Sequence, residues 1–161
     1  MAPRVVARHP RPPFGTMSAA PKLIPFPIKD VIPDPARLEA VDRYDVLGTP
    51  REEAFELITN LMRLILKTDS SIVSLIDGHR QWYKSAQGTA LSEVPIAESF
   101  CRVTIQGDEP VVVPDARKDP RFAKHPNVTG GLNVRSYIGV PLKTPDGHNI
   151  GTLCGFGLTP T

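Results

Sequence analysis

The sequence predicts an α+β domain built around an antiparallel sheet. Two segments with apolar residues at helical spacing lie together between residues 34 and 67, and strand-like segments joined by short turns follow them. Helices grouped ahead of hairpin-linked strands are typical of this class, whereas a parallel α/β sheet would alternate the two. The 161 residues of the chain favour one compact domain with a single flexible extension.

Residues 1–33 are expected to form a disordered, proline-rich arm ahead of a folded domain over residues 34–161. Nine of the 18 prolines lie in residues 1–36, where they remove amide donors that a helix or a central strand needs. This segment holds five basic and two acidic residues, so the rest of the chain is nearly neutral. A near-neutral domain does not favour nucleic-acid binding. The start of translation, at Met1 or Met17, stays open.

The cysteines and histidines predict neither a disulfide framework nor a metal site. The two cysteines, Cys101 and Cys154, match no structural zinc motif. The four histidines occur singly in expected tail, turn or loop positions, which favours solvated side chains over metal ligands. No apolar run approaches the roughly 20 residues that cross a bilayer. We therefore expect a cytoplasmic protein with no bound metal, no cofactor and no membrane contact.

Two helices are predicted ahead of the sheet. Asp34 and Pro35 form an N-cap followed by proline at the first helical position, and the helical spacing continues towards Gly48. A second helix is expected to begin at a capping box, in which Thr49 and Glu52 each accept from the other's backbone amide. Its apolar stripe comprises Ala54, Ile58, Leu61, Met62 and Ile65, widened by Leu57 and Leu64. We expect this stripe to pack on the rest of the fold, although such stripes also serve helix-to-helix association.

The strand-like segments are separated by turn residues. Strands are expected over residues 71–76, 81–85, 110–114, 136–142 and 149–156, and a short helix over residues 98–105. The first two strands form a hairpin, and the last two meet through a tight turn that contains Pro145 and Gly147. The strand over 110–114 is expected to be buried, bounded by prolines at each end.

The stretch from Asp115 to Asn133 is longer than an ordinary connection and predicts a lid over a binding pocket. The alternative is that Asp115 and Arg121 merely pin this loop through charge-assisted hydrogen bonds. Motifs of common enzymes are absent, among them phosphate-binding glycine loops, the nucleophile elbow and the zinc-protease helix.

A series of motifs in order resembles the GAF domain of bacterial signalling proteins, as found at the front of sensor histidine kinases and diguanylate cyclases. The motifs include Ser74-Leu75-Ile76-Asp77 and Glu98-Ser99-Phe100-Cys101. Others occupy residues 37–41, 47–50, 55–59, 80–85, 115–122, 127–130, 135–142 and 151–154. The resemblance implies a twisted antiparallel sheet with helices packed on one face and a ligand pocket on the other. It also implies that the usual C-terminal helix is lacking, because the sequence ends at Thr161.

The resemblance further implies which residues line the pocket. They are Ser74, Trp82, Ser99, Phe100, Cys101, Asp115, Phe122, Arg135 and Tyr137. Arg135 would fork to a carboxylate or phosphate of the ligand, or form a salt bridge to Asp115 instead. The aromatic residues Trp82 and Tyr137 equally suit a packing role.

The function implied is a non-enzymatic sensory domain that binds a small ligand under the lid and transmits the signal through its N-terminal helices. It would be a part or relative of a bacterial two-component or cyclic-di-nucleotide signalling protein, and a homodimer or a partner in trans would receive the signal. The cyclic-nucleotide signature of the family is missing, and Cys101 precedes Arg102 rather than the histidine of bilin-binding members. Two alternatives stay open: a thiol-based free methionine-R-sulfoxide reductase that uses Cys101, and a degenerate dimerisation module.

Overall fold

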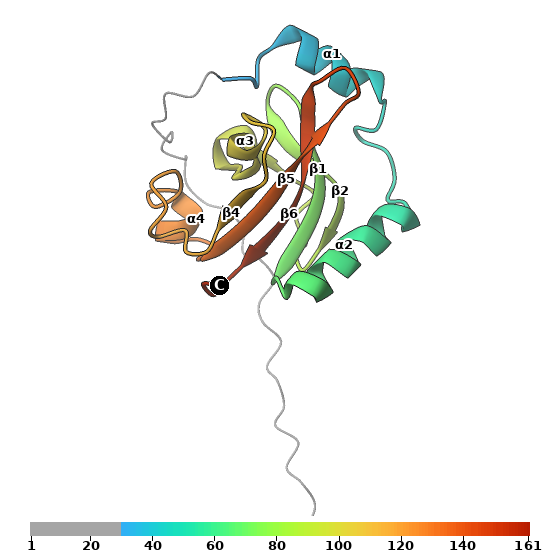
Figure 1. Cartoon of the computed structure of the whole chain (residues 1–161). Helices are drawn as coiled ribbons and strands as arrows, with labels where there is room; N and C mark the ends of the chain where they lie inside the picture. The colour runs from blue at the N-terminus through green and yellow to red at the C-terminus, as the bar shows by residue number, and fades with distance from the viewer. Residues whose placement is uncertain (1–29) are drawn as a thin grey trace, which may run out of the picture.

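A computed structural model describes residues 30–161 and contains one six-stranded antiparallel sheet (Figure 1). The strands are β1 Ser70–Ile76, β2 Arg80–Gln87, β3 Glu93–Pro95, β4 Val111–Val113, β5 Ser136–Lys143 and β6 Asn149–Gly157. Their order across the sheet is β3-β2-β1-β6-β5-β4. The helices are α1 Pro35–Arg43, α2 Glu53–Leu66, the 3-10 turn η1 Ile96–Glu98, α3 Cys101–Thr104 and α4 Pro126–Thr129. The predicted α+β class is thereby confirmed.

Helix α1 lies at one end of the sheet and is held there by Arg37 (Figure 1). The predicted N-cap is confirmed, since the Asp34 carboxylate accepts from the Ala36 amide at 3.0 Å. The buried Arg37 guanidinium donates to the carbonyls of Ile32 at 2.8 Å and Ile76 at 2.6 Å. Burial lowers the pKa of Arg37, against the pull of nearby carboxylates. Arg37 thus ties the chain that enters the domain to the end of β1.

The folded part of the chain includes residues ahead of the expected boundary at residue 34. Ile32 is 5% exposed and belongs to the main core cluster, and Val31 packs against the same cluster. The Val31 amide donates to Gln106 Oε1 at 3.0 Å. Residues 1–29 of the expected arm lie outside the described residues. Asp30, Val31 and Ile32 of the arm contact the domain.

The predicted capping box of α2 is wrong. Glu52 stands at the N-cap position without a side-chain hydrogen bond to the helix, and the Thr49 hydroxyl donates to the Val46 carbonyl at 2.6 Å. The reason lies in the sheet, where the buried Lys84 ammonium donates to Thr49 Oγ1 at 2.8 Å and to the Pro50 carbonyl at 2.6 Å. Lys84 thus holds the residues that would otherwise form the box.

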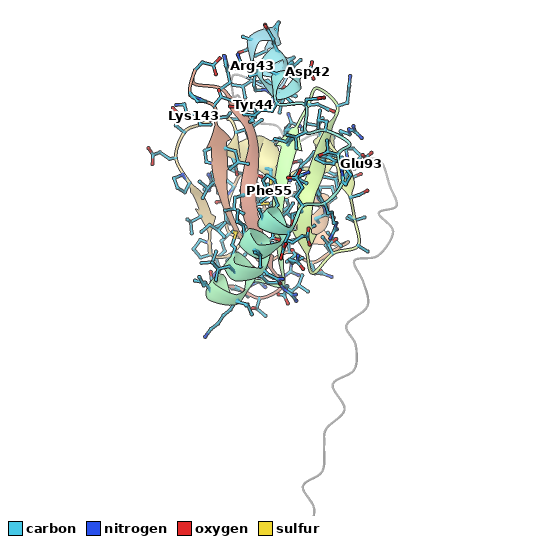
Figure 2. The ribbon with its side chains drawn as sticks, turned by 90° about the vertical axis from the view of Figure 1, so that its right-hand side faces the viewer. Asp42, Arg43, Tyr44, Phe55, Glu93 and Lys143 are labelled. Atoms are coloured by element: carbon cyan, nitrogen blue, oxygen red, sulfur yellow. The ribbon has the colours of Figure 1, made fainter. Side chains whose placement is uncertain are left out.

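The expected packing of α2 is also wrong for most of its apolar stripe, which points away from the sheet. Met62 is the exception, because it is half-buried beside Gly155 of β6. The exposed large side chains are Leu57, Ile58, Leu61, Leu64, Ile65 and Leu66. The helix lies across one face of the sheet (Figure 2) and meets it through polar groups. The fully buried Thr59 hydroxyl is 2.8 Å from Ser85 Oγ, and Glu56 accepts from Ser85 at 2.7 Å and from Gln87 at 2.9 Å.

The opposite face of the sheet carries the main hydrophobic core. Strands β1, β5 and β6 supply Ile72, Tyr137 and Cys154, and the segment between β4 and β5 supplies Phe122 and further buried residues. The loop predicted over 115–133 includes the short helix α4. The helix predicted over 98–105 is divided into η1 and α3.

The strand predicted as buried over 110–114 is an edge strand. β4 pairs with β5 alone, and Val112 at its centre is 57% exposed whereas Val113 is buried. An edge position leaves one side of the strand open to solvent, which an apolar run in the sequence does not reveal. The predicted hairpin β1–β2 and the final pair β5–β6 are confirmed. Gly147 takes a φ of 94° in the expected turn between β5 and β6.

Candidate functional site

A cavity opens on the core face of the sheet, between strands β1 and β2 and the segment 115–134. Its apolar walls come from Ile72, Tyr83, Leu91, Val94, Phe100, Leu132, Val134 and Phe156. Its polar lining comes from Ser70, Gln81, Thr89, Glu98 and Asn127. The hollow encloses about 470 Å³ of empty space, part of it open to solvent. The centre of a water molecule has about 40 Å³ in which to move there, so the cavity accommodates a small group as it stands.

Gln81 forms the polar floor of the cavity and is held by two of the residues predicted from the sequence. Its amide nitrogen donates to Ser74 Oγ at 2.9 Å, and its carbonyl oxygen accepts from Ser99 Oγ at 2.6 Å. Ser74 is in turn 3.0 Å from Thr152 Oγ1. Ser74 and Ser99 do not line the cavity themselves, but they fix the orientation of the amide that does.

Phe100 is the predicted residue that lines the cavity directly. Its ring stacks on Phe122 with a centroid distance of 4.6 Å and an interplanar angle of 5°, and its edge meets Phe156 at 5.6 Å. Tyr137 packs at 5.5 Å from the Phe100 ring. Phe122 and Tyr137 are therefore packing partners behind the wall, which keep Phe100 in place.

Cys101 forms a buried thiol pair with Cys154 rather than part of the cavity surface. The two sulfur atoms are 3.4 Å apart, and Tyr137 Oη lies 3.4 Å from Cys101 Sγ. Burial raises the pKa of the Cys154 thiol well above its ordinary value, and the adjacent Cys101 adds to this. Both thiols are fully buried, so neither faces solvent or the cavity.

Three of the predicted pocket residues lie elsewhere. Trp82 pairs in register with Leu75, which packs against α1, so strand alternation places Trp82 on the sheet face opposite the cavity. Arg135 donates to the Val128 and Val134 carbonyls, each at 3.0 Å, and so ties the lid segment to itself. The salt bridge from Arg135 to Asp115 considered above does not form, because Asp115 pairs with other residues.

Two ion pairs hold the lid segment, and in each an arginine pairs with the aspartate two residues before it. Arg117 donates to both carboxylate oxygens of Asp115, at 2.9 and 2.8 Å, and Arg121 does the same to Asp119 at 3.0 and 2.7 Å. The hydrogen bonds from Arg117 lower the pKa of Asp115 to about 2. The pinning role considered for Asp115 and Arg121 therefore agrees with their contacts, although each has a different partner.

His125 holds the next part of the lid from inside. It is fully buried, its Nδ1 accepts from the Asn127 amide at 3.0 Å, and its ring packs 4.4 Å from Phe100. Burial lowers the pKa of His125 to about 4, against the effect of the Glu98 backbone carbonyl. The ring is therefore neutral at neutral pH, and the expectation of a solvated surface residue is wrong at this position.

Sequence reasoning missed Glu98, Gln81 and Tyr83 as lining residues. Gln81 and Tyr83 are two residues apart on β2, so their side chains share one face of the strand and Trp82 lies on the other. This alternation is the sequence signal that could have found them. Glu98 lies in η1, and its carboxylate oxygen Oε2 is buried without a hydrogen-bond partner among the described residues. Burial raises the pKa of this carboxyl group.

Within residues 30–161, no cluster of three or more His, Cys, Asp or Glu side chains is arranged to hold a metal ion. Over the same residues, none of the helices combines the length and the apolar character needed to cross a membrane.

Comparisons with known proteins agree with this architecture. The family model of the GAF domain matches residues 50–160. A cyclic di-GMP phosphodiesterase from Pseudomonas aeruginosa is 35% identical over 119 residues, which is 74% of this chain and 20% of that protein. The chain therefore spans about a fifth of the length of this curated relative.

Solved structures with the same fold include the GAF domain of an Acinetobacter phosphoenolpyruvate-protein phosphotransferase. It has a TM-score of 0.53 and 17% identity, over 78% of this chain and 77% of that one. The free methionine-R-sulfoxide reductase of Neisseria meningitidis has a TM-score of 0.54 and 21% identity, over 76% and 72% of the two chains. At this level of identity the likeness establishes a shared fold.

Proposed function

Because the chain belongs to the GAF domain family, we propose that it is a non-enzymatic sensory domain that binds a small ligand in the cavity beneath the segment 115–134. The observation that carries this proposal is the cavity itself, which combines aromatic walls with a fixed amide at Gln81. Concave, mostly apolar sites with a few oriented polar groups are the usual form of small-molecule sites. The curated relative suggests that the domain serves cyclic-di-nucleotide signalling, although it matches only a fifth of that protein.

Ligand binding is tested by a thermal-shift screen of small metabolites, followed by a variant that fills the cavity. Leu132 lines the cavity and is half-buried, so Leu132→Trp should abolish the shift that a binding metabolite produces. Val112→Trp places the same side chain on the exposed strand β4 and should leave the shift unchanged. A screen in which no metabolite stabilises the wild type would refute the proposal.

We also propose that the ligand-binding signal passes to a second copy of this chain, which pairs with the first through the apolar face of α2. Leu57, Leu61 and Leu64 are spaced four and three residues apart along α2, and their exposed fractions are 62%, 59% and 74%. This spacing is that of a coiled-coil seam. The hydrogen bonds between α2 and the sheet do not use these side chains, which are exposed, so the apolar face is free to pair. Contiguous exposed apolar surface of this kind marks interaction sites.

The dimer is tested by light scattering coupled to size-exclusion chromatography. We expect a dimer for the wild type and a folded monomer for Leu61→Glu, because a carboxylate in the seam would be buried without a partner. Asn60→Glu adds the same charge next to the seam and should preserve the dimer. A monomeric wild type at micromolar concentration would remove this part of the proposal.

The non-enzymatic assignment competes with a thiol reductase, since one solved structure of the same fold is a free methionine-R-sulfoxide reductase. A thiol attack requires a thiolate that the substrate can reach. The burial of Cys101 and Cys154 supports the sensory function instead. We expect no reduction of free methionine-R-sulfoxide above background in the presence of dithiothreitol. Turnover that disappears in Cys101→Ser would replace the proposed function with the enzymatic one.

A further inference from the structure

The charge of the cavity is confined to one side chain. Among the residues that line it, Glu98 is the one acid, and none is lysine, arginine or histidine. Tyr83 also lines the cavity, but burial raises the pKa of its hydroxyl far from neutral pH, so it carries no charge. Nothing in this lining offsets a negative ligand, and one group favours a positive one.

Glu98 differs from the other acids near the lid because its buried oxygen is unsatisfied. Asp115 and Asp119 each receive two hydrogen bonds from an arginine, and Glu93 on β3 is paired with Arg80. Glu98 Oε2 lies buried with no partner in the described part of the chain. A buried carboxylate oxygen without a donor is costly, and a ligand that supplies the donor would remove this cost.

Three aromatic rings line part of the same cavity. Phe100, Tyr83 and Phe156 line the cavity together with Glu98, and the rings of Phe100 and Phe156 meet edge to face. Aromatic faces attract organic cations, and this attraction increases when water is excluded. The unpaired Glu98 oxygen and the aromatic side chains therefore both favour a positively charged ligand.

Building on the proposed ligand-binding function, we infer that the cavity recognises a small organic cation whose ammonium group donates a hydrogen bond to Glu98 Oε2. The ligand carries an N–H donor, so it is a primary or secondary amine rather than a quaternary one, which has no proton to donate. Its tail is short and apolar, because the apolar part of the wall includes Ile72, Val94 and Val134 and the cavity is small. Phosphates and carboxylates are rejected, since no lining cation would compensate for their charge.

The experiment uses three probes of nearly the same shape and different charge: 3-methylbutylamine, 3-methyl-1-butanol and 4-methylpentanoate. Each is titrated into the full chain, and binding is followed by protein-detected NMR at concentrations up to about 10 mM, where weak binding of small ligands is measurable. We expect the amine to bind at least about tenfold more tightly than the alcohol, as a charge-assisted hydrogen bond allows, and the carboxylate not to bind.

Glu98→Gln isolates the charge. It should reduce affinity for the amine at least about tenfold and leave affinity for the alcohol unchanged, because shape and apolar contacts are retained. It should also keep or raise the melting temperature without ligand, since it removes an unpaired buried carboxylate. Glu93→Gln removes a carboxylate at the edge of the sheet, labelled in Figure 2, that does not line the cavity, and should leave amine binding as in the wild type.

The outcomes separate this inference from the function on which it rests. Tighter binding of the carboxylate than of the amine, or an amine affinity unchanged in Glu98→Gln, overturns the cationic ligand while the cavity still binds small molecules. No binding by any of the three probes overturns the cationic ligand as well. The ligand-binding function then depends on the metabolite screen with Leu132→Trp, whose result does not rely on charge.

Discussion

Acid should destabilise the protein through His125, whose side chain is buried in its neutral form. The pKa of His125 falls to about 4 in the folded protein because of burial, whereas an unfolded histidine titrates near 6.5. Above about pH 6.5 both states hold a neutral ring, and the full stability is present. As the pH falls towards 4, the unfolded state takes up a proton that the folded state cannot, and stability is lost. A shift of about 2.5 units corresponds to about 3 kcal/mol.

The perturbation that isolates this effect is His125→Asn. His125 is the N-cap of α4, where its Nδ1 accepts from the Asn127 amide, and asparagine is a favoured N-cap residue that can accept the same hydrogen bond without titrating. The free energy of unfolding is measured by urea denaturation of both proteins from pH 7.5 to pH 4.0. Carboxylates titrate in both proteins alike, so their contribution cancels in the difference. We expect the wild type to lose about 3 kcal/mol more than the variant over this range.

Parallel pH profiles of the two proteins would refute the reasoning. They would mean that the His125 ring accepts a proton in the folded state, so that the lid contains an acceptor or a water path to Nε2. A difference of the opposite sign would mean that the charged ring stabilises the fold.

Two further predictions concern packing. Arg37→Met should lower the free energy of unfolding by about 3–5 kcal/mol, because it leaves buried carbonyls without donors. Arg43→Met removes an exposed ion pair and should lower it by less than about 1 kcal/mol. Urea denaturation measures both. A Cβ at Gly139 would lie 2.6 Å from Tyr137 Cζ, so Gly139→Ala should lower the free energy of unfolding by about 3 kcal/mol. Gly107 has open space around its Cβ position, so Gly107→Ala should change the melting temperature little. Equal costs within either pair would contradict the structure.

Five of the six strands were predicted close to their observed limits because local signals define them, but β3 Glu93–Pro95 was not expected. The turn at Gly147 and the alternation along β5 and β6 carry enough information to set both strand limits to within a residue or two. The N-cap at Asp34 is another local signal, and it is correct. The capping box at Thr49 failed because Lys84, 35 residues further along the chain, binds the same hydroxyl.

The candidate site was harder to predict because it depends on which face each strand residue takes. The register of β1 and β2 pairs Ser74 with Tyr83 and Leu75 with Trp82, and this pairing decides that Tyr83 rather than Trp82 reaches the cavity. The orientation of α2 was unpredictable for a related reason. Hydrophobicity assigns the apolar stripe to the interior, whereas the hydrogen bonds of Thr59 and Glu56 to β2 show that the polar side faces the sheet.

The two edge strands of the sheet, β3 and β4, affect how readily copies of this protein aggregate. An open strand edge is a template for cross-β aggregation, and proteins suppress it with short strands and prolines. β3 and β4 each have three residues, β3 ends in Pro95, and Pro110 and Pro114 flank β4. Pairing through backbone amides is therefore disfavoured at both edges, so a concentrated solution of this domain should resist fibril growth even if the apolar face of α2 is uncovered.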